Sequence, residues 1–346
     1  MADYYDISNW NEKPWFGTKG SRNKRVVENP TTGKYCYFKT SLFKPDKDYK
    51  YEFWSEIIAS EIGTLLGFNV LKYDIAYCNG EIGCISEFMN TEGENELTEG
   101  IQYLTGYNTA YKPSRKESKK EYTFQFICDT LKSYDFQHYI PDIIKIIIFD
   151  SLIGNGDRHQ ENWGIITDNR SAIKLYKTEA GKKGHKIMTR ITLKLFAWVM
   201  QNVPNFPVKL RIKYHRFMPN AFAPIYDNGS CLGRELLDAR VNEMLSDETQ
   251  FITYIQRGTS EIHWEGKKLS HFDLIKKISG NYSDVVKTEI LRIKTLFRED
   301  GVVNIINEID KALPSDKINL GLPEERKRLI IKMVSLRYKE LIKLLA

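Results

Sequence analysis

The first part of the chain alternates short β-prone runs with turn residues. Residues 26–28 and 35–38 are runs rich in β-branched and aromatic side chains, which are typical of strands. Residues 29–33, Asn-Pro-Thr-Thr-Gly, lie between the two runs and have the composition of a turn. The pattern therefore predicts two short strands that are neighbours in a sheet.

An amphipathic helix and a hairpin follow these strands. Apolar residues recur at helical spacing from Asp48 to Leu66, and Gly67 follows as a stop signal. Residues 70–77 and 82–88 are again β-prone, and the Asn79-Gly80 pair between them is a strong hairpin signal. We therefore expect residues 1–90 to form a β-rich unit with one helix.

The pattern changes after residue 90. Residues 95–125 are polar and rich in Lys, Glu, Ser and Thr, which predicts a mobile connection or a lobe surface. From about Ile140 the apolar spacing becomes mostly helical, and the last helix is predicted over residues 324–345. This separation of strands from helices along the chain indicates an α+β fold.

The composition is that of an ordinary globular protein. Of its 346 residues, 42% are hydrophobic and 28% are charged, and 51 basic against 45 acidic residues give a mild net charge of +6. The N-terminus lacks a secretory signal, and no apolar run is long enough to span a bilayer. The five scattered cysteines lack metal-binding spacing and are typical of a reducing compartment. We expect a cytoplasmic protein, and export without a cleaved signal stays open as an alternative.

The most informative segment is residues 154–166. An apolar helical run breaks at Gly154, and a dense polar cluster with Asp157, His159 and Asn162 follows. Phosphoryl transfer needs one oxygen that orients the attacking hydroxyl and one amide oxygen that holds magnesium. We assign Asp157 and His159 to the catalytic loop, Asp157 to accept or orient a proton and His159 to brace the loop, and Asn162 to Mg²⁺. A purely structural loop with Asp157 as a helix N-cap is the alternative.

A second aspartate stands in Tyr-Asp-Asn-Gly, residues 226–229, directly after a β-like approach. Magnesium usually takes one or two carboxylates from a protein and completes its shell with phosphate and water oxygens. We therefore expect Asp227 to be the main magnesium ligand. The alternative is a plain hairpin turn, which this composition also fits.

Lys39 ends the strand-like run 35–38 and is placed to reach inward to a phosphate. The predicted helix carries Glu52 and Glu56 on one line, and either could hold the lysine by an ion pair. We choose Glu56, because it is nearer the middle of the helix. The alternative for Lys39 is a surface residue on an edge strand.

A loop before the first of these strands contains Gly17, Thr18, Gly20 and Ser21. Its backbone N–H groups could approach phosphates, although a plain turn is the alternative reading of so weak a motif. The combined order is a glycine-bearing loop, a strand lysine, a helix glutamate, an Asp…Asn loop and Asp-x-Gly. This order follows the logic of a kinase.

At these residues the chain resembles the HipA-like kinases, within the wider group that includes phosphoinositide 3/4-kinases. The resemblance rests on Gly156-Asp-Arg-His-Gln-Glu-Asn162 and on residues 226–229. It implies a bilobal kinase with an N-lobe over residues 1–90 and a helical C-lobe over 91–346. It implies ATP and Mg²⁺ as cofactors, with Lys39 on the phosphates. It also implies that Glu87, Phe88 and Met89 form the adenine-binding hinge.

The chain departs from HipA toxins in two places. The phosphate loop begins near residue 16, which leaves no room for the N-terminal subdomain that engages an antitoxin. The basic insertion 168–216 is longer than the family pattern. The resemblance is therefore to the compact, stand-alone members, and we expect neither an antitoxin nor operator DNA as a partner.

The leading hypothesis is a Ser/Thr protein kinase with an unidentified protein substrate, which also phosphorylates itself, with Ser21 as one candidate acceptor. A phosphoinositide or small-molecule kinase is the second, because the basic insertion 168–216 could face an anionic membrane surface. A third is a binding module, either an inactive kinase fold or a nucleic-acid binder. The presence of Lys39, Asp157, Asn162 and Asp227 argues against the inactive fold.

Overall fold

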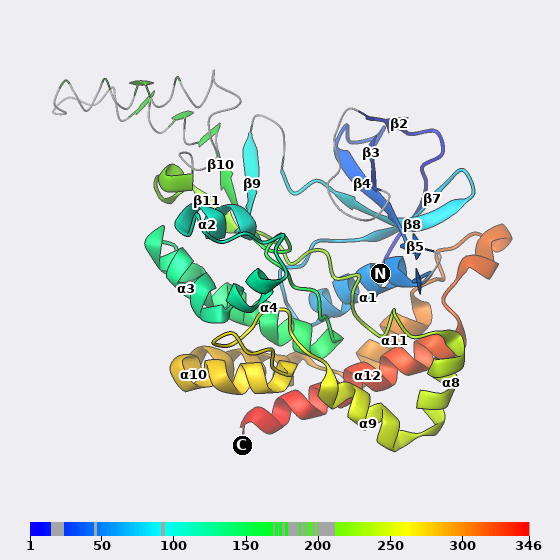
Figure 1. The fold of residues 1–346 in the computed structure, drawn as a ribbon. Coiled ribbons are helices and arrows are strands. Elements are labelled where there is room, and N and C mark those ends of the chain that lie inside the picture. The colour runs from blue at the N-terminus through cyan, green and yellow to red at the C-terminus, as the bar shows by residue number, and fades with distance from the viewer. Residues whose placement is uncertain are drawn as a thin grey trace.

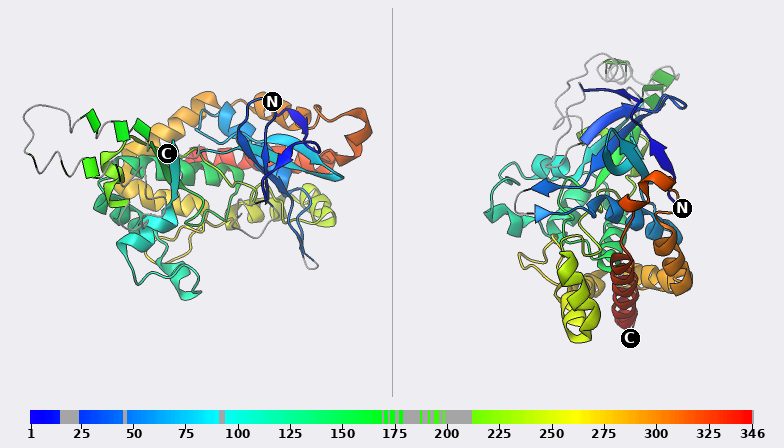
Figure 2. Two further views of the ribbon diagram at one scale, coloured as in Figure 1. Left: turned by 90° about the horizontal axis from the view of Figure 1, so that it is seen from above. Right: turned by 90° about the vertical axis from the view of Figure 1, so that its right-hand side faces the viewer.

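A computed structural model describes residues 1–14, 24–44, 47–90, 94–168 and 212–345, with isolated positions between 170 and 198. In this part of the chain the strands gather at one end of the molecule and most helices at the other (Figure 1). The separation persists in the side view, where the C-terminus lies at the end away from the strands (Figure 2). The predicted α+β fold, with a β-rich N-terminal part and a helical C-terminal part, is confirmed.

The N-terminal part is built on one sheet. Within the described residues its strand order is β1-β7-β8-β4-β3-β2, and β1 pairs with β7 in parallel while the other pairs are antiparallel. Its strands are β1 (Tyr4–Asp6), β2 (Asn11–Glu12), β3 (Lys24–Glu28), β4 (Tyr35–Thr40), β7 (Asp74–Cys78) and β8 (Glu81–Glu87). A separate two-stranded ribbon is formed by β5 (Phe43–Lys44) and β6 (Lys47–Asp48).

The predicted turns join these strands. Asn79 and Gly80 connect β7 to β8 with φ of 49° and 95°, the left-handed conformation that the predicted hairpin turn requires. Gly33, at φ 69°, closes the turn between β3 and β4, and its N–H donates to the carbonyl of Asn29. Local turn chemistry therefore sets the register in which β4 carries Lys39 between β3 and β8.

Most of the described helices lie below the sheet in Figure 1. The described α-helices are α1 (Glu52–Leu65), α2 (Gly100–Tyr107), α3 (Phe124–Ser133), α4 (Ile140–Ile153), α8 (Asp238–Ser246), α9 (Glu248–Arg257), α10 (His271–Leu296), α11 (Glu299–Glu308) and α12 (Glu324–Ile342). Short 3-10 helices cover Glu117–Glu121, Gln137–Tyr139, Ile212–Phe217, Ser315–Leu320 and Lys343–Leu345. Among the described helices, none combines the length and apolar character needed to cross a bilayer.

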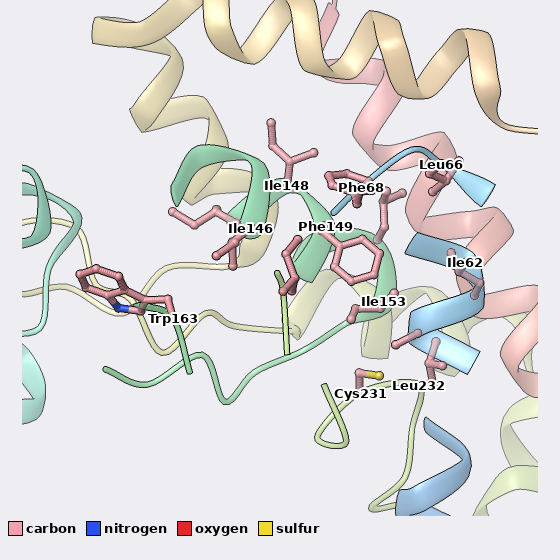
Figure 3. Close-up of a cluster of buried hydrophobic side chains, with 14 of the residues drawn as sticks. Ile62, Leu66, Phe68, Ile146, Ile148, Phe149, Ile153, Trp163, Cys231 and Leu232 are labelled. Carbon is pink, nitrogen blue, oxygen red and sulfur yellow. The ribbon is translucent and has the colours of Figure 1, made fainter. Parts of the chain in front are cut away.

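The main core joins the two parts. Ile62 and Leu66 of the α1 region face Phe149 and Ile153 of α4, with Leu232 beside them (Figure 3). The helix α4 is apolar almost all round and packs against α10 and α12, so it is a buried central element. Continuous burial from α1 to α4 fixes the single helix of the N-terminal part relative to the segment that follows α4.

Two predictions about local structure need correction. Residues 95–125 are not a mobile connection, because they contain β9 (Asn95–Glu99), α2 and the start of α3, whereas the exposed positions between 107 and 121 agree with the alternative of a lobe surface. β9 pairs with β10 (Gly164–Asp168), which also pairs with β11 (Asn220–Phe222), so partners distant in sequence stabilise a polar segment. The predicted strand 70–77 is shortened to β7, because Val70 instead bridges to Ile225.

Two predicted features lie mostly or wholly outside the described residues. The phosphate loop with Gly17, Thr18, Gly20 and Ser21 falls entirely there, as does most of the basic insertion 168–216. All five cysteines are described, and each is buried with its thiol outside any disulfide.

Candidate active site

The first residues of the loop after α4 fix the conformation of that loop. Gly154 ends the helix with φ 70°, and a side chain there would collide with the guanidinium of Arg337. The buried Asn155 then binds both ends of the turn, since its amide donates to Asp150 at 3.1 Å and its oxygen accepts from the Asp157 N–H at 3.1 Å. Asp157 is thereby held at the mouth of the loop with its side chain exposed.

Arg158 organises the whole site, although its position in the sequence predicted no role for it. It is fully buried and makes a two-pronged ion pair with Asp150 of α4, at 3.0 and 2.7 Å. It also donates to the carbonyls of Asn162 (2.9 Å) and Tyr226 (2.7 Å) and to the side-chain oxygen of Asn228 (2.6 Å). Burial opposes the charge, but Asp150 raises the pKa of Arg158 above its usual value. One cation therefore ties the loop 154–166 to the segment 226–229.

Asn162 and His159 lie within the same loop. The Asn162 amide donates to the carbonyl of Asp157 at 2.9 Å, which orients the side chain and directs its oxygen away from that contact. The His159 Nδ1 accepts from the N–H of Glu161 at 3.3 Å, and the imidazole is partly exposed. Both contacts of the His159 ring are with Glu161 of the same loop, and the bracing role expected of His159 stays a prediction.

Asp227 lies in a strained turn opposite the loop. Its φ of 56° is left-handed, a conformation that non-glycine residues adopt at a cost and that clusters at functional sites. The turn is held from both sides, because the Asp227 N–H donates to the Tyr73 hydroxyl at 3.3 Å and the Asn228 N–H donates to Glu56 at 2.7 Å. The fold thus dictates where the Asp227 carboxylate points.

Lys39 of β4 joins Glu56 of α1 to Asp227. Its Nζ lies 3.6 Å from Glu56 of α1 and 3.3 Å from Asp227, and its side chain is 8% exposed. Burial opposes its charge, but the carboxylates of Asp227 and Glu56, with Tyr73, raise the pKa of Lys39 well above its usual value. The lysine is therefore a positive charge held in place, and the alternative of an edge-strand surface lysine is excluded. Glu56, chosen over Glu52 from the sequence, is the residue that pairs with it.

Glu87, Phe88 and Met89 lie where β8 leaves the sheet. The Phe88 ring stacks on Tyr37 at 4.1 Å between centroids, and Tyr37 is two residues before Lys39 and thus on the same face of β4. Glu87 points the other way and pairs with Lys34 at 2.7 Å. A cavity of about 450 Å³ borders this segment, but Tyr5, Cys36 and Ile85 also line it. Since these residues belong to the cluster on the other face of the sheet, the cavity is distinct from the space beside Lys39.

The residues present fit a magnesium nucleotide. Asp227 offers a carboxylate and Asn162 an amide oxygen, which are the hard oxygen ligands that Mg²⁺ prefers. Lys39 adds a fixed positive charge at the Asp227 carboxylate. Asp157, Asn162, Asp227, Lys39 and Glu56 are thus brought together, although 188 residues separate Lys39 from Asp227 in the chain. The geometry can hold a polyphosphate and orient a hydroxyl beside it.

The fold is similar to that of two solved kinases, one of them a HipA. The crystal structure of the Helicobacter pylori proinflammatory kinase CtkA matches with a TM-score of 0.69 and 18% identity, over 100% of this chain and 96% of that chain. HipA of Shewanella oneidensis MR-1, in a complex with HipB and its operator DNA, matches with a TM-score of 0.51 and 12% identity, over 98% and 67%. The fold that the sequence resemblance implied is therefore confirmed. No family model and no curated protein sequence matches the chain.

Proposed function

We propose that this protein is a kinase that uses Mg-ATP, transfers the γ-phosphate to Ser or Thr hydroxyls of proteins, and phosphorylates itself. One observation carries the proposal: the Lys39–Glu56 pair, the Asp227 turn and the loop with Asp157 and Asn162 are joined by direct contacts and by Arg158. The likeness of fold to two kinases supports it.

Each side chain has a role that follows from its surroundings. Lys39 is charged and fixed, so it binds the polyphosphate without having to be ordered first. Asp227 and the Asn162 amide oxygen would hold Mg²⁺, which neutralises charge that develops on the transferring phosphate. Arg158 keeps these two ligands at a fixed separation, because it binds the carbonyl of Asn162 and the side chain of Asn228.

Asp157 is suited to the acceptor. It is exposed, whereas Lys39 and Asn162 are buried and Asp227 is only partly exposed, so a hydroxyl on another molecule can reach Asp157. A carboxylate there would orient the hydroxyl and take up its proton as the new oxygen–phosphorus bond forms. The bond from the γ-phosphorus to the bridging oxygen would break at the same time, with ADP as the leaving group.

The class of acceptor is tested by determining which molecule receives the labelled γ-phosphate. Incubation with Mg²⁺ and ATP labelled at the γ-phosphate, together with casein and phosphoinositide vesicles, should place label on protein, and mass spectrometry should find phosphoserine or phosphothreonine. Ser21, in the segment outside the described residues, is a candidate site of self-phosphorylation. Label only in lipid would favour the phosphoinositide alternative, and no transfer to protein, lipid or water by a folded protein would refute the proposal.

A further inference from the structure

Helix α1 carries two buried glutamates one turn apart. Glu56 is 0% exposed and Glu52 is 1% exposed, and their spacing of four residues places both on one face of the helix. Glu56 serves the nucleotide side, through Lys39 and the Asn228 N–H. Glu52 binds the Leu42 N–H and Arg234 instead, and the function proposed above gives it no role.

Glu52 is connected instead to Asp157, the residue assigned to the acceptor hydroxyl. It forms an ion pair with Arg234, whose guanidinium also lies over the Tyr49 ring at 4.2 Å. Arg234 donates to the hydroxyl of Ser230 at 2.9 Å, and that hydroxyl donates to Oδ2 of Asp157 at 3.2 Å. Three consecutive contacts therefore connect the first turn of α1 to the carboxylate assigned to the acceptor.

We propose that Glu52, Arg234 and Ser230 are positioning residues that hold the Asp157 carboxylate for the acceptor hydroxyl. The inference rests on the proposed function. Ser230 holds Oδ2, so rotation of the carboxylate is restricted and Oδ1 is presented to an incoming hydroxyl. Asp157 is exposed, and without this contact its side chain would sample several rotamers. A catalytic carboxylate that is already held in one orientation loses less conformational entropy on reaching the transition state.

Glu52 and Arg234 are themselves held firmly enough to position Asp157 through Ser230. The buried Glu52 carboxylate also accepts the Leu42 N–H at 3.0 Å, two residues after β4. Arg234 is 16% exposed, so its ion pair with Glu52 is largely shielded from water. A planar guanidinium can bind a carboxylate and a hydroxyl at once, which a lysine ammonium at that position does less well. Helix α1 thereby sets the nucleotide side through Glu56 and the acceptor side through Glu52.

The alternative role is that the Glu52–Arg234 pair merely holds the two lobes together. A purely structural pair would lower stability and reduce all activities equally. A positioning role predicts a split between substrates, because Glu52 and Glu56 act on different sides of the same cleft.

The test compares Glu52→Gln, Arg234→Met and Ser230→Ala with Glu56→Gln, using Mg-ATP and casein. The first three should lower kcat for casein by about tenfold to a hundredfold, with the KM for ATP within about twofold of wild type. Glu56→Gln should raise the KM for ATP instead. Arg234→Lys should lie between wild type and Arg234→Met. The matched control is Arg240→Met, which removes an arginine from an exposed ion pair with Glu243 and should leave both constants unchanged.

A second readout needs no turnover. In the nucleotide-free protein, hydrogen exchange of the backbone amides in residues 155–162 should be faster in all three positioning variants than in wild type and in Arg240→Met. Unchanged exchange together with parallel losses in kcat for casein and in ATP use would overturn the inference and leave the proposed function standing. If wild-type protein transfers no phosphate at all, the proposed function fails, and the exchange rates still decide whether Glu52 holds the loop.

Discussion

The two sides of the cleft are built in different ways. On the nucleotide side, Lys39, Glu56 and Arg158 are buried, charged and paired, and their partners come from both lobes. On the acceptor side, Asp157 is exposed and its carboxylate is held by one serine hydroxyl. The nucleotide is a constant ligand that a rigid, desolvated site can match, whereas the acceptor side has to stay open to a hydroxyl on a larger molecule. The difference predicts that substitutions on the two sides fail in different ways.

The largest effect is expected for the two aspartates. Asp157→Ala and Asp227→Ala should each lower phosphate transfer by about a hundredfold to ten-thousandfold. Asp157→Ala should leave the thermal unfolding midpoint unchanged, because the side chain is exposed. Steady-state turnover and calorimetry on the same preparations measure both quantities. Full Mg-ATP turnover by Asp227→Ala would show that this residue is not the metal ligand.

Arg158→Met should act on the fold as well as on the site. It leaves the Asp150 carboxylate buried without its partner, and breaking a buried pair in this way costs about 3–5 kcal/mol. Urea unfolding measures the loss. The matched control is Arg170→Met, since the pair of Arg170 with Glu94 is exposed and such pairs contribute about 0–1 kcal/mol. Equal losses for the two variants would contradict the central place given to Arg158.

The smallest expected effect is on the pH dependence of stability, and it comes from a histidine of α10, outside the site. Burial, with Arg337 and Lys268 nearby, lowers the pKa of His271 well below its usual value. The unfolded chain therefore takes up this proton first as the pH falls through about 6.5, so stability is complete above that pH and decreases below it. The free energy of unfolding should fall between pH 7 and pH 5.5 through this group, by at most about 1.3 kcal/mol.

His271→Phe is the variant that isolates this contribution. It should keep the buried ring and remove the titration, so the difference between wild type and variant should grow as the pH falls. Lys39 and Arg158, whose pKa values are raised, stay charged throughout this range. A decrease in stability of the same size in His271→Phe would assign the pH effect to other groups.

Local signals in the sequence predicted much of this architecture. Asn79 and Gly80 favour a hairpin by their own backbone preferences, and Glu56 was chosen as the partner of Lys39 because it is nearer the middle of its helix. β9 could not be found in this way, because its polar residues are stabilised by pairing with β10. Arg158 stands inside the motif used to recognise the loop, yet its role depends on Asp150, eight positions earlier on a buried helix. An aspartate within an otherwise apolar helix was the one available signal for that pair.

The contacts that run from Glu52 through Arg234 and Ser230 to Asp157 could not be predicted from the sequence for the same reason. From the sequence, Glu52 and Glu56 differ only in their place along the helix, and nothing indicates that Arg234 lies beside the first of them. The partner is 182 residues away and is brought near by the turn that follows Asp227. Long-range convergence of this kind follows from the tertiary fold and cannot be read from local spacing.

The most direct test of the account is a crystal structure of the protein with Mg²⁺ and a non-hydrolysable ATP analogue. The account predicts a metal ion bound by an oxygen of Asp227 and the amide oxygen of Asn162, with Lys39 on a phosphate and Asp157 facing the terminal phosphate. A nucleotide bound elsewhere, such as in the cavity lined by Tyr5, Cys36 and Ile85, with Asp227 and Asn162 making no contact with the metal, would contradict it.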